Sequence, residues 1–233
     1  WNFNDNTQNF SSNNYGNTLS LTSSDGINLT VTAWSDTADI NGPDEIQTAR
    51  LNWAQTTALG VINRDESTGS PNHSVDSVTG DADGEYDMLL MEFDTAVNLN
   101  AIDLNWATGG NSSNRADVSI LAWDGVGSDT LNGNTWGQVL GGGFDSAGNY
   151  NNVDLNYFAV NPTDIVSTQW LIGVYNPVFG AGGDAGDDGF KLGAIYTSDD
   201  TPPPPNGVPV PGSLPLVLLG LFAMRNKIGK KFA

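Results

Sequence analysis

The chain of 233 residues contains no cysteine, a single histidine and only eight basic residues. Without cysteine there can be neither a disulfide scaffold nor a thiol nucleophile. One histidine, His73, excludes a metal site built from several histidines. A serine triad would have to use His73, yet the chain has no Gly-x-Ser-x-Gly motif to supply the serine. We therefore expect a protein that is not an enzyme.

Basic residues are scarcest before the C-terminus, where only Arg50, Arg64, Arg115 and Lys191 oppose 27 acidic residues. That part of the chain carries a formal charge of −23, and the C-terminal segment carries +4. An acidic body repels nucleic acid and anionic membrane surfaces, so nucleic acid is not an expected partner. The asymmetry between the two parts is itself a signal of a membrane or of another interaction.

The sequence has few residues that favour helix, because only four of the 27 acids are glutamate and Asp, Asn and Gly favour turns. Apolar residues instead alternate with polar ones, which is the period of a half-buried strand. The runs that predict strands are 27–33, 87–94, 97–106, 118–122, 153–157, 170–175 and 190–194. A change of parity near Asn100–Ala101 predicts a β-bulge.

Turn signals such as Asp25-Gly26 and Asp124-Gly125 separate these runs. Short strands joined by such turns predict an all-β domain, a jelly-roll-like β-sandwich, over residues 1–198. No amphipathic helix is expected before the C-terminal segment. The start at Trp1 rather than Met favours a signal peptide that has been removed.

The C-terminal segment has a proline-rich linker at 199–212 and a single short hydrophobic helix with a basic end at 213–233. The uncharged run from Val208 to Met224 would be about 25 Å long as a helix, which only just spans a bilayer. Basic residues beyond it stay on the cytoplasmic side, so the body would face outward. The residues assigned to sorting and anchoring are Pro209, Pro211, Leu214, Leu218, Leu219, Leu221, Arg225, Lys227, Lys230 and Lys231.

This segment resembles the PEP-CTERM sorting signal of exosortase-dependent proteins in Gram-negative bacteria. The body resembles a recurrent exosortase-dependent surface protein in the stretches SPNHSVD (70–76), MLLMEFDTAVNLNAIDLNWA (88–107), DVSILAWDG (117–125), WLIGVYN (170–176) and DDGFKLGAI (187–195). The resemblance implies export, handling by an exosortase at the membrane and attachment to the cell surface. Because Pro209-Val210-Pro211 lacks the family's glutamate, we expect the tail to be kept, in the membrane or buried in an assembly.

Two acidic, glycine-containing loops are candidate calcium sites. Asp81, Asp83 and Asp87 have the 1, 3, 7 spacing of calcium loops, and Asp184, Asp187 and Asp188 form the second group. Carboxylate oxygens are hard ligands that suit a hard cation. The alternative is that both loops are solvated turns.

Two further residues are candidate ligand contacts. Trp136, in the polar stretch NGNTWGQ, is the best candidate for an exposed ring that stacks on a sugar. His73 either fixes a turn or contacts a ligand.

The sequence thus supports two interpretations. The first is a structural surface or matrix protein that self-associates into a filament or sheath through its retained helix. The second is a membrane-tethered, calcium-dependent module that binds polysaccharide.

Overall fold

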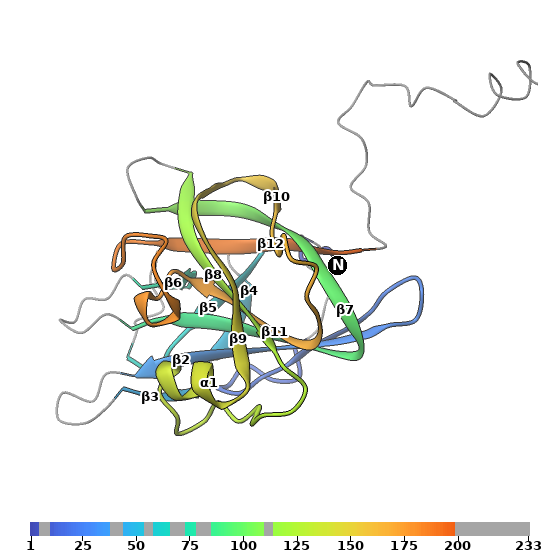
Figure 1. The fold of residues 1–233 in the computed structure, drawn as a ribbon, viewed down its shortest axis with the longest axis horizontal. Helices are drawn as coiled ribbons and strands as arrows, with labels where there is room; N and C mark the ends of the chain where they lie inside the picture. The colour runs from blue at the N-terminus through green and yellow to red at the C-terminus, as the bar shows by residue number, and fades with distance from the viewer. Residues whose placement is uncertain are drawn as a thin grey trace, which may run out of the picture. The chain divides into compact units, whose positions relative to one another are not determined.

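The computed structural model describes residues 1–4, 10–37, 44–53, 58–65, 73–77, 85–109 and 114–198. Within these residues the all-β prediction is confirmed, since the strands pair into one antiparallel sheet (Figure 1). The elements are β1 (Leu19–Thr22), β2 (Asn28–Thr37), β3 (Glu45–Thr48), β4 (Arg50–Trp53), β5 (Leu59–Ile62), β6 (Val75–Asp76), β7 (Asp87–Thr108), β8 (Arg115–Trp123), α1 (Trp136–Gly142), β9 (Phe144–Asp154), β10 (Asn156–Ala159), β11 (Val166–Val174), η2 (Pro177–Phe179) and β12 (Gly189–Thr197). The main path through the sheet runs β4-β5-β12-β7-β11-β8-β9.

The 22-residue strand β7 connects two halves of this sheet. Its first half pairs with β2 and β11, so that Leu89 lies opposite both Ala33 and Ile172. Its second half pairs with β10 and β12, so that Ile102 lies opposite both Phe158 and Ile195. β7 therefore joins two groups of strands, β2 and β11 along its first half and β10 and β12 along its second.

The predicted bulge in this strand is confirmed. The register between β7 and β12 shifts between Tyr196 and Thr197, which pair with Ala101 and Leu99 and leave Asn100 without a register partner. The buried positions change parity there, from Leu99 and Ala101 to Ile102 and Leu104. A bulge moves the side chains that follow it to the opposite face of the sheet, as the change of parity in the sequence predicts.

Side chains from both halves of the sheet share one large core. Leu29 and Val31 of β2 belong to the same buried cluster as Leu104 of β7 and Leu192 of β12. Trp170 of β11 is the largest fully buried side chain in the described part of the chain. Apolar burial of this kind is the main stabilising contribution to a fold that has no disulfides.

The run 153–157 was expected to form one strand, and this prediction is wrong. β9 ends at Asp154 and β10 begins at Asn156, whose φ of 76° lies in the left-handed region. Asparagine tolerates this conformation better than most residues do. The turn takes the chain away from β8, the partner of β9, and toward β7, the partner of β10.

The expectation of no helix before the C-terminal segment is also wrong. Thr135 caps α1 by accepting a hydrogen bond from the Gln138 N–H, and the Gln138 side chain accepts one from the Thr135 N–H. This reciprocal capping box satisfies two backbone donors and starts a helix of only seven residues. The predicted linker, the terminal helix and all of the sorting and anchoring residues lie outside the described residues.

Candidate cation site and adjacent pocket

Three aspartates from two parts of the chain meet at one point. Asp117 lies in β8, and Asp184 and Asp188 lie in the connection that leads from β11 to β12. Each offers a carboxylate oxygen, and the three oxygens lie within 4.8 Å of one another. We call this group the cation site. Asp117 and Asp188 are buried, at 2% and 0% exposure, whereas Asp184 is exposed and opens the site to solvent.

Backbone N–H groups hold the two buried carboxylates in place. Asp188 Oδ1 accepts a hydrogen bond of 2.7 Å from the Asp117 N–H. Asp117 Oδ1 accepts one of 2.6 Å from the Asn152 N–H, and its Oδ2 accepts one of 3.0 Å from the Asp184 N–H. The second oxygen of Asp188, Oδ2, is buried and has no hydrogen-bond partner. A buried oxygen of this kind is rare in folded proteins and needs an explanation.

The electrostatics of the cation site favour a bound positive charge. The pKa of Asp188 is raised to about 7, mainly by burial and also by the charges of Asp117, Asp187 and Asp184, while the hydrogen bond from the Asp117 N–H lowers it. Burial likewise raises the pKa of Asp117. Two oxygens bound to one calcium ion can be up to about 5 Å apart, since each Ca–O distance is about 2.3–2.6 Å. The spacing of the three carboxylates therefore fits one calcium ion, with backbone oxygens or water completing its ligands.

The second predicted calcium loop is thus only partly reproduced. Asp184 and Asp188 come together, but the carboxylate of Asp187 is not among the three that converge. Asp117 was missed, although an aspartate inside an apolar strand is an unusual residue and is a signal in its own right. Of the first predicted loop, Asp81 and Asp83 lie outside the described residues. Asp87 is buried at the start of β7, where its Oδ2 accepts a hydrogen bond of 3.4 Å from the Asp76 N–H.

His73 lies in the interior and not on an open ligand-binding surface. Its side chain is 9% exposed, and its Nε2 lies 3.1 Å from the Nζ of Lys191. The Lys191 ammonium lies over the ring of Trp106, 5.1 Å from the centroid, and burial lowers the pKa of Lys191. With Lys191 charged, its ammonium can only donate, and Nε2 of His73 is then the acceptor in this contact.

Trp136 is 2% exposed, so the prediction of an exposed aromatic ring is wrong. It is the first residue of α1, and its ring packs edge-on against Phe179 of η2 with centroids 6.0 Å apart. The polar sequence around Trp136 reflects the helix cap, while the ring itself enters a second, smaller apolar cluster.

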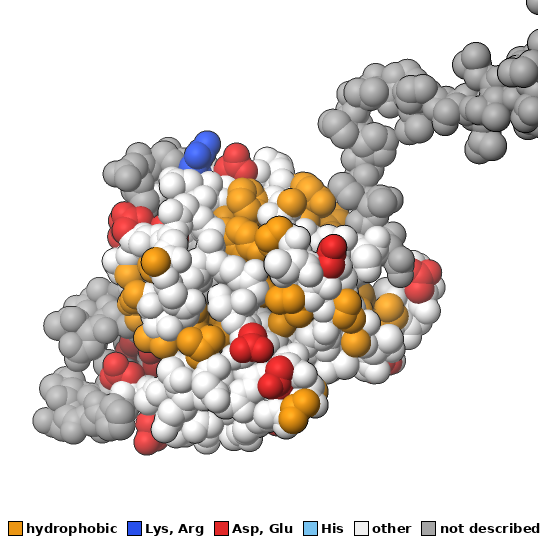
Figure 2. All heavy atoms as spheres, in the orientation of Figure 1, with side chains coloured by type: hydrophobic (Ala, Val, Ile, Leu, Met, Phe, Trp, Pro, Cys, Tyr) orange, Lys and Arg blue, Asp and Glu red, His pale blue; other side chains and the backbone are white. Residues whose placement is uncertain are grey.

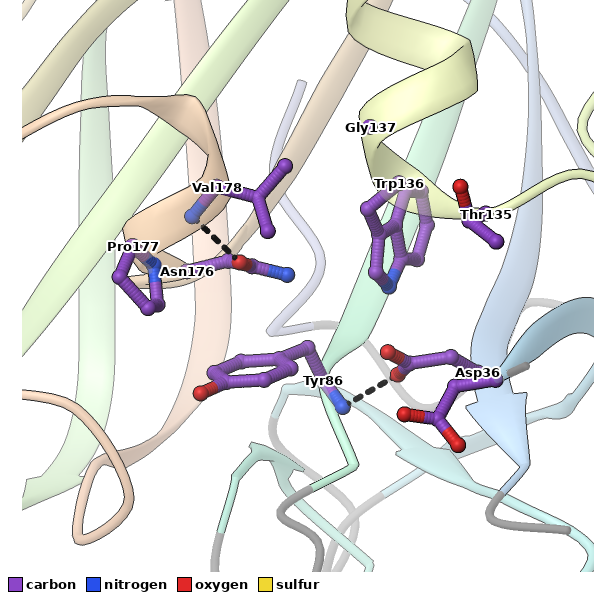
Figure 3. A pocket seen from close by; sticks show the side chains of 9 residues that line it. Asp36, Tyr86, Thr135, Trp136, Gly137, Asn176, Pro177 and Val178 are labelled. Atoms are coloured by element: carbon purple, nitrogen blue, oxygen red, sulfur yellow. Dashed lines mark hydrogen bonds between the residues drawn. The ribbon is translucent and has the colours of Figure 1, made fainter. Parts of the chain in front are cut away.

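Beside the buried ring lies a pocket of about 330 Å³ (Figure 3). Its walls come from the end of β2, the residues before β7, the start of α1 and η2, and they include Asp36, Tyr86, Trp136, Asn176 and Val178. His73 is not among the lining residues.

One acid dominates the electrostatics of this pocket. Asp36 is 6% exposed, and its Oδ1 accepts a hydrogen bond of 2.6 Å from the Tyr86 N–H. The pKa of Asp36 is raised to about 7, mainly by burial and to a smaller extent by the charge of Asp44, while the Tyr86 N–H and the Trp136 indole lower it. Burial and the charge of Asp36 also raise the pKa of Tyr86.

Within the described part of the chain, no helix has the length and apolar character that crossing a membrane requires. No protein-family model matches the chain, and no curated protein or solved structure is similar to it.

Proposed function

We propose that the chain is an exported, non-catalytic structural protein of a Gram-negative cell surface or extracellular matrix, whose β body is held rigid by calcium. Its body is a jelly-roll-like sandwich, followed by a proline-rich linker and an apolar helix with a basic end. The observation that carries the proposal is the cation site, where the buried Oδ2 of Asp188 has no partner while two more carboxylates lie within 4.8 Å.

Calcium at this site would connect parts of the chain that are far apart in sequence. It would link Asp117 in the interior of β8 to the connection before β12, which carries the other two carboxylates. It would also reduce the repulsion in a strongly acidic body. Figure 2 shows acidic side chains scattered over the visible face with few basic ones among them. A calcium-loaded body would therefore be stiffer and better suited to close packing.

The resemblance to PEP-CTERM proteins supplies the remaining parts of the proposal. An exosortase and the membrane are the partners of the C-terminal helix, and further copies of the chain are the partners of the body and the retained helix in a filament or sheath. The basic cluster Arg225–Lys231 supports an orientation with the body outside. The second candidate function, a calcium-dependent polysaccharide-binding module, is favoured by the pocket beside Trp136.

The proposal is tested first by calcium titration of the full chain, kept in mild detergent, with isothermal calorimetry. We expect one calcium ion per cation site. Asp188→Asn should weaken this binding about 100-fold, because it replaces the unpartnered oxygen with an amide nitrogen. Asp145→Asn is the matched control, since Asp145 is exposed on β9 and its loss changes the net charge equally. Equal binding by the two variants would contradict the assignment.

Assembly is tested by size-exclusion chromatography and negative-stain microscopy of the full chain and of a chain that lacks Val208–Ala233. We expect large assemblies for the full chain and a folded, soluble monomer for the shortened one. A full chain that stays monomeric at every protein and calcium concentration would refute self-association. A shortened chain that fails to fold would show that the segment belongs to the core.

A further inference from the structure

The pocket beside Trp136 has the size and the walls of a small-molecule site. Its volume of about 330 Å³ is at the lower end of the range of roughly 300–1,000 Å³ typical of ligand pockets. Two walls are formed by the aromatic side chains of Tyr86 and Trp136, and a third by the half-exposed Val178. None of the three carboxylates of the cation site lines it, so the two sites are separate.

Two hydrogen-bond donors of this pocket, on Trp136 and Asn176, are available to a ligand. The indole Nε1 of Trp136 is buried and makes no hydrogen bond of normal geometry, although it faces the Asp36 carboxylate closely enough to lower the pKa of that group. Figure 3 shows it pointing toward the side of the pocket where Asp36 lies. Asn176 is buried, and its Oδ1 accepts a hydrogen bond of 2.9 Å from the Val178 N–H, which leaves the amide nitrogen as a donor. A ligand oxygen placed to accept from Trp136 Nε1 would give this buried donor a hydrogen bond of normal geometry.

The acceptor at this pocket is the carboxylate of Asp36, which lies on the side toward which the Trp136 indole points (Figure 3). A group that pairs with both must accept from an N–H and donate to a carboxylate. A hydroxyl does both, whereas an ammonium has no lone pair for Trp136 and an anion would be repelled by Asp36 and Asp44. The aromatic and apolar walls suit the C–H face of a ring.

We propose that this pocket binds one sugar ring of a neutral polysaccharide, with one ring hydroxyl accepting from Trp136 Nε1 and a hydroxyl donating to Asp36. The apolar face of the sugar lies against Tyr86. Asn176 donates to a further hydroxyl. This site gives the body a ligand of its own; it rests on the second candidate function above and names the class of sugar and the contacts that would bind it.

The test is a binding titration of the full chain, with calcium in excess, against three groups of probes. These are neutral oligosaccharides of glucose, mannose and galactose, the corresponding amino sugars, and oligosaccharides of uronic acids. We expect binding to at least one neutral oligosaccharide, and none to the uronic acids. Binding to amino sugars alone would overturn the proposal, because it would identify a site for a cation. Absence of binding to every neutral probe would also overturn it.

Two variants locate the site. Trp136→Phe removes the indole N–H but keeps an aromatic ring against Phe179, and Asp36→Asn removes the acceptor charge. Each should weaken binding about tenfold, the ratio that corresponds to the loss of one hydrogen bond of about 1.4 kcal/mol. Trp123→Phe is the control, since its indole donates to the Gly127 carbonyl away from the pocket lining, and binding should not change. Wild-type affinity in both pocket variants would refute the location.

The sugar titration can fail independently of the calcium titration. A chain that binds calcium in calorimetry and no neutral sugar contradicts only the pocket. A chain that binds sugar and no calcium contradicts only the cation site.

Discussion

The replacement of Asp188 by asparagine gives the sharpest prediction about stability. The substitution keeps the shape of the side chain and the Oδ1 that accepts from the Asp117 N–H. It removes the charge of a fully buried carboxylate that lies beside two other acids. Its effect on the free energy of unfolding should therefore have opposite signs with and without calcium.

The size of the calcium effect follows from the affinity. A site of three carboxylates, two of them already held by backbone N–H groups, should have a Kd within the range of about 10⁻⁷–10⁻⁴ M, and we take about 10 µM. At 1 mM calcium this stabilises the folded state by about 2.7 kcal/mol. For a domain of this size that corresponds to a rise in Tm of roughly 5–10 °C.

The variant should lose nearly all of this gain. Loss of a ligand weakens metal binding by at least the ~10–100-fold seen for outer-shell partners, and a Kd near 1 mM leaves only about 0.4 kcal/mol of stabilisation. Without calcium at pH 8 the variant should instead be more stable than the wild type, because one buried charge is gone.

The assay is differential scanning calorimetry of the full chain in mild detergent, with calcium or with EDTA, and with Asp145→Asn as the control. The control should respond to calcium as the wild type does. An equal Tm of the wild type in calcium and in EDTA would refute the reasoning. A variant that is less stable than the wild type in EDTA would show that Asp188 is a structural acid with another partner.

Three more predictions concern the same site. Calcium affinity should rise about tenfold per pH unit up to about pH 7 and then level off, because the proton that Asp188 holds must leave. The calcium-free chain should lose stability as pH rises from about 4 to about 7, because the raised pKa of Asp188 means that the folded state binds its proton more tightly than the unfolded state does. Urea unfolding at several pH values measures this loss. Gly183→Ala should weaken calcium binding in calorimetry, because its Cβ would lie 2.7 Å from Asp117 Oδ2 and from the Tyr175 ring. Gly141→Ala, whose Cβ meets nothing within 4 Å, should leave the affinity unchanged.

β2 was predictable because it is buried on one face, which imposes a period of two on its sequence. β8 and the second half of β11 are buried on both faces, and their apolar runs were the signal there. Even the bulge near Asn100 could be located, since a slip in register changes the parity of the apolar residues. The break between β9 and β10 could not, because it depends on a left-handed asparagine that a strand pattern does not distinguish. Local periodicity therefore determines strands better than it determines where the chain changes partners.

The site residues were less predictable because they depend on contacts between distant segments. Asp184 and Asp188 could be selected as a pair from their loop, but Asp117 joins them across the fold through the Asp184 N–H. Trp136 was misassigned because its neighbours form a helix cap, and polar capping residues were taken as the environment of the ring. A Thr-x-x-Gln pattern ahead of Val139 was the available signal for a short helix with a buried face.

The abundance of aspartate hides two different uses of the same side chain. Asp124 is exposed, and its Oδ1 accepts hydrogen bonds from the N–H groups of Gly127 and Val126. These bonds lower the pKa of Asp124, so it stays ionised and forms a turn. Asp36 and Asp188 are buried, and burial raises the pKa of each to about 7. Asp124 already has its hydrogen-bond partners, whereas Asp188 keeps a buried oxygen without a partner. Asp36 faces the buried Trp136 indole N–H without a hydrogen bond of normal geometry between them. In a body with 27 acids, the shortage of partners around a carboxylate therefore indicates a binding site better than its presence in an acidic run does.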